Sequence, residues 1–273
     1  MLGRVGLIAA LSLTAASFAS AEAAIPETEL AKPLQSYKGY VSEQVDLLVS
    51  RTRKFVEEIK DGNLAEAQGL YAPARQPYER IEPVAELFND LDTAIDARED
   101  DYERKSDDPK FTGFHRIEKV LFHDNTTKGL EATADKLLAD VLELQKRLKT
   151  LEIKPKNMVG GAAALIEEVA SGKITGEEDR YSRTDLWDFH ANVDGAQKIV
   201  ALLKPLLDKH NPELEKKVAA NFKTVDTILD KYKVKDGFQS YDKLTEADRN
   251  ALKGPITTLA EDLSTLRGVL GLS

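Results

Sequence analysis

Cysteine is absent from the 273-residue chain, and only 7% of its residues are aromatic. Without cysteine the protein can form no disulfide, use no thiolate as a metal ligand and have no cysteine nucleophile. The sequence also lacks the alternating runs of β-branched residues that predict paired strands. Long stretches are instead rich in Ala, Leu, Glu and Lys, a mixture that favours helices.

An excess of positive charge is missing as well, because the formal charge is −9. Nucleic acid and anionic membrane surfaces are therefore not expected partners. Several catalytic patterns are absent too: the His-Glu-x-x-His zinc helix, the phosphate-binding glycine loop and the dinucleotide fingerprint. None of these three motifs therefore supports a catalytic function.

The N-terminus has the pattern of a signal peptide covering residues 1–23. Arg4 supplies a short positive region, Val5 to Ala19 is apolar, and small residues allow cleavage after Ala21 or Ala23. The apolar run is shorter than the roughly 18 residues of a membrane anchor. Export without disulfides predicts a periplasmic protein that is not embedded in the membrane.

Apolar residues at helical spacing dominate the rest of the chain. One stripe extends from Leu30 to Ile59, another from Leu130 to Leu151, and further stripes cover Leu186 to Leu207, Leu214 to Tyr232 and Leu252 to Leu270. A helix over residues 77–91 is also expected, kinked or shortened by Pro83. We therefore predict an all-α fold of long antiparallel helices over residues 24–273, in two lobes with a seam near residues 151–157.

His115 and Glu118 stand three residues apart and so share one face of a helix. At about 100° per residue, Glu118 falls inside an apolar arc between Phe114 and Phe122. A buried carboxylate needs a cation, a hydrogen-bonding partner or a proton, and a metal ion also bound by the imidazole would provide one. The alternative is a Glu118 paired with an arginine and a core His115 satisfied by a backbone carbonyl.

Other acidic residues are ambiguous by themselves. Glu79, Glu82 and Glu86 form a stripe that is typical of a solvated helix face. The polar segment from Asp96 to Gly113 is either a solvated loop or one that lines a ligand site. Glu177 to Asp179 have the character of acids in the first turn of a helix.

In combination these segments resemble the imelysin-like proteins, in particular their EfeO/EfeM branch of periplasmic iron-uptake components. The stretch Gly113-Phe114-His115-Arg116-Ile117-Glu118-Lys119 matches the His-x-x-Glu motif of that family. Three further stretches fit in the same order, and the similarity covers essentially the whole mature chain: Tyr78 to Pro83, Ile95 to Asp101, and Lys173 to Phe189.

The resemblance implies a two-lobed helical bundle with a metal site in a cleft. Carried over position by position, it implies six ligands: His115, Glu118, Glu79, Glu82, Asp96 and Glu178. An oxygen-rich set with one imidazole suits iron, with zinc, copper or calcium as other candidate cations. Many EfeO proteins also carry a cupredoxin domain, but this chain has no cysteine and keeps only Met158 after the predicted cleavage. It is therefore similar to the short, EfeM-type form.

The same resemblance implies further partners and alternative functions. An iron carrier of this family implies an inner-membrane transporter as recipient. One short member binds alginate, so alginate binding in polysaccharide import is the alternative primary role, with the metal bridging carboxylates. A metallopeptidase is the third possibility, because imelysin-type proteins have been grouped with peptidases on the basis of His-x-x-Glu.

Overall fold

Helices account for most of residues 25–272, which are the residues that this computed structural model describes, and the all-α prediction is confirmed. The predicted signal peptide, residues 1–23, lies outside the described residues. The long helices are α1 (Glu27–Lys60), α2 (Leu64–Glu79), α6 (Glu131–Thr150), α7 (Pro155–Ser171), α8 (Asp185–His210), α9 (Pro212–Leu229) and α10 (Glu246–Ser264). The shorter ones are α3 (Glu82–Ala85), α4 (Asn89–Asp96), α5 (Gly113–Glu118) and α11 (Leu266–Val269).

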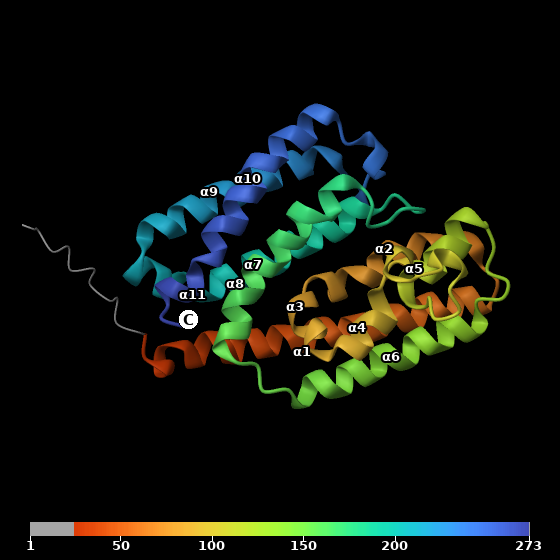
Figure 1. Ribbon diagram of the computed structural model, residues 1–273, viewed down its shortest axis with the longest axis horizontal. Helices are drawn as coiled ribbons and strands as arrows, with labels where there is room; N and C mark the ends of the chain where they lie inside the picture. Colours follow the sequence, from red (N-terminus) through yellow and green to blue (C-terminus); the bar gives the residue numbers. More distant parts are fainter. Residues whose placement is uncertain (1–24, 273) are drawn as a thin grey trace, which may run out of the picture.

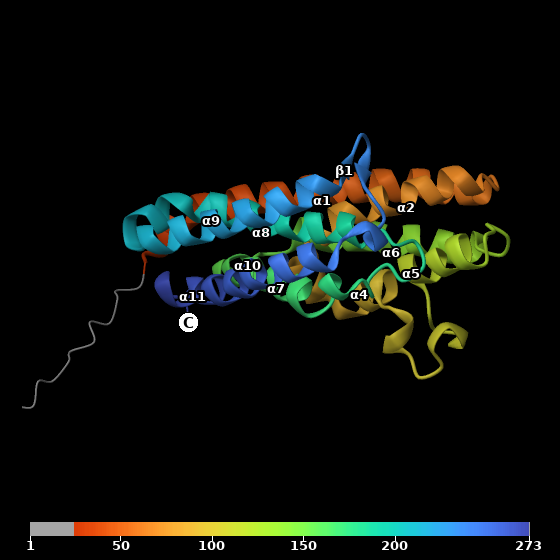
Figure 2. The same ribbon diagram turned by 90° about the horizontal axis from the view of Figure 1, so that it is seen from above.

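The helices form two groups that share one hydrophobic core. In the first group α1 packs between α2 and α6, and α4 and α5 pack against α6. In the second, α7 and α9 each pack against both α8 and α10. Helix α1 extends along both groups, and α2 contacts α8. Helix α11, close to the C-terminus, lies near the first turn of α1 at one end of the molecule (Figures 1 and 2).

The predicted seam falls on the connection between α6 and α7, where residues 151–154 are irregular. Pro155 is the first residue of α7, a position where a missing N–H costs nothing. Buried side chains from both groups belong to one continuous cluster. The division into two lobes stays a prediction.

Two expectations from the sequence were wrong in detail. The helix expected over residues 77–91 is instead the end of α2, then α3, a 3-10 turn at Glu86–Phe88 and the start of α4. Pro83 cannot donate to the preceding turn, so the chain breaks after Arg80 and restarts. A short antiparallel pair, β1 (Lys233–Val234) with β2 (Gly237–Phe238), also occurs although no strands were expected.

The breaks between α2 and α5 position the candidate site. They produce several helix ends close together, while the long helices hold those ends in place. Between α4 and α5 lies an irregular segment with 3-10 turns at Glu99–Asp101 and Lys105–Asp107, which projects from the body of the molecule (Figure 2). No helix within residues 25–272 combines the length and the apolar character needed to cross a membrane.

Candidate metal centre

The candidate site forms where the ends of several elements meet. Asp96 is the last residue of α4, and His115 and Glu118 lie on the short helix α5. Glu178 comes from the turn segment 176–184 that precedes α8. Three separate pieces of chain thus contribute these four side chains to one small volume.

His115 is the centre of this volume and is almost completely buried. Its Nδ1 atom lies 3.5 Å from Glu118 Oε2 and 3.5 Å from the hydroxyl of Tyr71. Its Nε2 atom lies 3.7 Å from Asp96 Oδ1 and 3.9 Å from Glu178 Oε1. Nε2 is also buried without a hydrogen-bond partner. A nitrogen in that state has a free lone pair or proton directed at two carboxylates.

Glu118 is buried inside the apolar arc, as the helical spacing predicted. Among residues 25–272 no arginine pairs with it. Its Oε1 atom accepts hydrogen bonds from the backbone N–H groups of Tyr181, at 2.9 Å, and Ser182, at 2.7 Å. These bonds fix the carboxylate and leave Oε2 facing the imidazole.

Arg75 of α2 is fully buried beside these acids. Its guanidinium lies 2.6 Å from both Glu79 and Asp96, 3.2 Å from Asp188 and 3.3 Å from Glu178. A single guanidinium thereby reaches carboxylates from four elements or segments. It partly neutralises the cluster when no other cation is present.

Glu79 and Glu82 lie on the other side of Arg75 and face a second buried cation. Lys173 Nζ contacts Glu79 Oε2 and lies 3.2 Å from Glu82 Oε2. The side-chain amide of Asn192 donates to Glu82 Oε2 at 3.0 Å. The six residues that the resemblance suggested are thus all drawn together, but in two groups. One group is His115 with its three neighbours Glu118, Asp96 and Glu178. The other is Glu79 with Glu82, beside Lys173.

Acids outnumber cations in this interior. Seven carboxylates of the cluster are buried, Glu79, Glu82, Glu118, Glu178, Asp179, Asp185 and Asp188, against two cationic side chains, Arg75 and Lys173. Burial raises the pKa of Asp96 to about 6 and that of Asp185 to about 7. Burial thus favours the protonated forms of these two carboxyls, whereas a nearby cation favours their ionised forms.

Glu178 and His115 are shifted toward their charged forms. Burial alone would raise the pKa of Glu178, but Lys173, His115, Arg75 and Arg98 outweigh it and lower the pKa to about 2. Burial and the charge of Arg75 lower the pKa of His115, yet the neighbouring carboxylates raise it above its ordinary value. Glu178 is thus ionised and placed to bind a cation.

Two cavities border the site. A small one of about 10 Å³ touches His115, Glu118 and Glu178. A larger one of about 360 Å³, here called the acidic pocket, contains seven carboxylates: Glu82, Glu86, Asp92, Asp96, Asp101, Glu168 and Glu178. The acidic pocket provides a route along which a cation could approach the buried centre.

A set of polar contacts closes the site on its outer side. Arg180 NH1 lies 2.6 Å from Glu99 Oε1, and its NH2 contacts Asp100. The hydroxyl of Tyr181 donates to Glu99 Oε2 at 2.7 Å. This clip, made of Arg180 and Tyr181 with Glu99 and Asp100, joins segment 176–184 to the irregular segment after α4.

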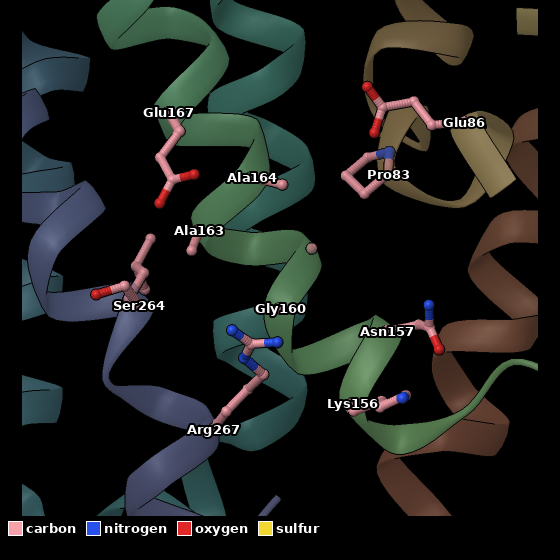
Figure 3. A pocket seen from close by; sticks show the side chains of 12 residues that line it. Pro83, Glu86, Lys156, Asn157, Gly160, Ala163, Ala164, Glu167, Ser264 and Arg267 are labelled. Carbon is pink, nitrogen blue, oxygen red and sulfur yellow. The ribbon is translucent and has the colours of Figure 1, made fainter. Parts of the chain in front are cut away.

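A separate groove of about 330 Å³ lies on α7 (Figure 3). The small residues Gly160, Ala163 and Ala164 form its floor, and Lys156 and Arg267 lie toward one end. Glu86 borders both this groove and the acidic pocket. The groove itself contains none of the residues around His115.

Sequence reasoning missed several residues of the cluster and misread one segment. Arg75, Lys173 and Tyr71 were not singled out, although so many acids need a buried cation, and Asp179 was not named as a member of the site. Glu177 to Asp179 do not begin a helix, because α8 starts only at Asp185. Asp179 instead accepts hydrogen bonds from Tyr71, at 2.9 Å, and Thr184, at 2.6 Å.

Comparison with known proteins identifies the family. The Imelysin family model, which is classed among peptidases, matches residues 33–266. This chain belongs to the imelysin family.

Its curated relatives carry the name "Iron uptake system component EfeO". The protein of Yersinia pestis is 63% identical over 262 residues, which is 96% of this chain and 70% of the relative. Those of Yersinia pseudotuberculosis serotype I (strain IP32953) and Escherichia coli O1:K1 / APEC are both 66% identical, over 89% and 88% of this chain. The chain spans 65% and 64% of the length of these two proteins.

Proposed function

We propose that this imelysin-family chain captures a metal ion for iron uptake and holds it with His115, Glu118, Asp96 and Glu178. The observation that carries the proposal is the buried, unpartnered Nε2 of His115, which lies 3.7 Å and 3.9 Å from two carboxylate oxygens. Ligands that each bind one ion at about 2.1 Å lie roughly 3–4 Å apart. The side chains therefore need little movement to surround an ion.

Glu79 and Glu82 remain part of the proposed ligand set, in a supporting position. In the absence of an ion their charge is balanced by Lys173. Asp179 joins the set, because one of its oxygens lies within 4.8 Å of ligand atoms of His115 and Glu118. These carboxylates add negative charge around an ion whose closest ligands are the four named above.

The donor set supports iron as the cargo. Carboxylate oxygens with one imidazole and no sulfur suit hard or borderline cations, which include Fe²⁺ and Fe³⁺. The name of the relatives points to the same metal. Zinc, copper and calcium are the competitors against which the preference is measured.

The proposed place of action is the periplasm, after removal of residues 1–23. An inner-membrane transporter is the proposed recipient of the ion, since the relatives are named as components of an uptake system. Pulse labelling that finds a shortened mature protein in the periplasmic fraction would support export. Recovery of the full-length chain in the cytoplasm would contradict it.

The ligand assignment is tested by elemental analysis and calorimetry of the mature protein with Fe²⁺ under anaerobic conditions. His115→Ala and Glu118→Ala should lose most of the bound iron. His210→Ala and Glu103→Ala serve as controls, because His210 ends α8 far from the site and Glu103 is exposed. Equal iron content in all four variants would overturn the assignment.

A metallopeptidase activity is the second candidate, favoured by the class of the matching family model. Within it Glu118 would act as ligand or as general base. Incubation with casein, with and without chelator, tests this candidate. Metal-dependent cleavage that disappears in Glu118→Ala would support it, and intact casein would remove it.

Acidic polysaccharide is the alternative cargo. The groove of Figure 3 favours it, because Lys156 and Arg267 form no ion pair within the described residues. Calorimetric titration with alginate oligomers, with and without chelator, distinguishes polysaccharide binding from simple iron carriage. No heat in either condition would eliminate this cargo.

A further inference from the structure

Arg98 lies where the small cavity at His115 meets the acidic pocket, and it lines both. Its NH1 group donates to Glu178 Oε2 at 3.0 Å. Glu178 lines both cavities as well. A cation that moves from the acidic pocket to His115 therefore meets the Arg98–Glu178 ion pair on its way.

Arg98 differs from the other cations of the site in how firmly it is held. The side chains of Arg75 and Lys173 are at most 1% exposed, and each contacts three or more carboxylates. The side chain of Arg98 is 38% exposed, and Glu178 is its single acidic partner within the described residues. Arg98 is the cation of the cluster that can leave at low cost.

The local backbone permits this movement. The backbone N–H of Arg98 donates to Asp101 Oδ2 at 2.8 Å, so the chain stays in place when the side chain turns. Asp92, Asp101 and Glu168 also line the acidic pocket and offer the guanidinium new acidic neighbours. When the Arg98 side chain is displaced, its partly solvated ion pair with Glu178 is exchanged for one with an acid of the acidic pocket.

We propose that Arg98 is the displaceable counter-ion of the metal site, bound to Glu178 when the site is empty and expelled into the acidic pocket when a metal ion arrives. This inference rests on the proposed function. It makes Arg98 a residue that determines specificity by charge. A sodium or potassium ion only replaces one positive charge with another, whereas a divalent or trivalent ion gains attraction to every carboxylate around it.

The test compares Arg98→Met with Arg104→Met in the mature protein. Both variants remove one positive charge from the same irregular segment, but Arg104 is exposed and contacts no acid within the described residues. Association of Fe²⁺ is followed by anaerobic stopped-flow competition with a coloured chelator, and the Kd is taken from calorimetry. Circular dichroism verifies folding, and Arg98→Ala and Arg98→Lys are measured in parallel.

Loss of the positive charge in Arg98→Met should raise the association rate about tenfold and lower the Kd, whereas Arg104→Met should change the rate by about twofold or less. Arg98→Lys, which keeps the charge, should stay near the wild-type rate. Equal rates for Arg98→Met and Arg104→Met would overturn the inference. A weaker affinity in Arg98→Met would also overturn it, because Arg98 would then be holding Glu178 in a binding position.

The wild-type titration distinguishes a failure of the Arg98 proposal from a failure of the proposed function. Iron binding by the wild type without an effect of Arg98→Met would contradict the role of Arg98 alone. No binding by the wild type or by any Arg98 variant would overturn the proposed function and this inference with it. Binding only after removal of Arg98 would also overturn both, since the wild type would then capture no iron and the ion could not displace the arginine.

Discussion

At the scale of single residues, Glu118 illustrates how backbone and side chain cooperate. Its Oε1 atom accepts from two consecutive N–H groups, those of Tyr181 and Ser182, while Oε2 faces His115. A carboxylate fixed in this way stays in position without any ion. The residue therefore has a structural role that exists independently of metal binding.

We expect Glu118→Ala to lower the free energy of unfolding by about 2 kcal/mol, because two backbone donors lose a charged acceptor. Urea unfolding of the metal-free protein measures the change. Glu103→Ala, in an exposed position, should stay within about 0.5 kcal/mol of wild type. An unaltered unfolding midpoint in Glu118→Ala would show that these hydrogen bonds contribute nothing.

Replacement of Arg75 should have a larger effect. Arg75→Met leaves several buried carboxylates without their shared guanidinium, so we expect a loss of about 3 kcal/mol or more. Saturating Fe²⁺ should recover part of the loss, since the ion supplies replacement charge. Thermal unfolding with and without the metal checks both parts, with the exposed Arg53→Met as control. A variant as stable as wild type would contradict the balance of charge described for the cluster.

At the scale of elements, the start of α5 depends on one glycine. Gly113 has φ of +81°, and a Cβ atom there would lie 2.3 Å from the carbonyl oxygen of Ile95, in the last turn of α4. Only glycine lets α5 begin so close to α4, and that proximity brings His115 next to Asp96. The glycine can be read from the sequence, but the close approach of α4 that requires it cannot.

Gly113→Ala should therefore destabilise the protein by more than about 3 kcal/mol, as strain and steric overlap add together, and should weaken iron binding. Gly129 offers a matched comparison, because it has φ of +80° with nothing within 4 Å of the added carbon. Gly129→Ala should cost only about 1–2 kcal/mol and leave iron binding intact. Similar losses in the two variants would disprove the steric argument.

The clip over the site is also an element-scale feature. Removing its central acid in Glu99→Ala should increase amide hydrogen exchange in residues 97–112, while global stability changes by less than about 1 kcal/mol. Mass spectrometry of exchanged peptides measures the first effect and urea unfolding the second. Unaltered exchange in that segment would mean that the clip does not restrain it. Glu103→Ala in the same segment provides the baseline.

The sequence predicted the helices better than the tertiary contacts between them. Helical periodicity gave the long helices and placed Glu118 in an apolar arc, because both depend on near neighbours in the chain. Arg75 and Lys173 lie 40 and 58 residues from His115, so no local spacing connects them to it. Glu178 was identified only through family resemblance, and its segment was misread as a helix start. The missing information was tertiary in each case.

At the scale of the whole molecule, the formal charge of −9 should attract cations from a distance. We expect the association rate of Fe²⁺ to fall several-fold between low and high salt, because the screening length shrinks from about 30 Å at 0.01 M to about 10 Å at 0.1 M ionic strength. Stopped-flow measurements over a salt series check this. A rate independent of salt would mean that only contacts inside the site govern capture.

The buried cations have one more consequence for the proposed carrier. Many small metal sites fold only around their ion, so that releasing the ion means losing the structure. Here Arg75 and Lys173 offset part of the buried negative charge when no ion is bound, and one hydrophobic core continues through both helix groups. The empty protein is therefore a durable species. In the proposed function, one copy could then release its ion without unfolding and bind another.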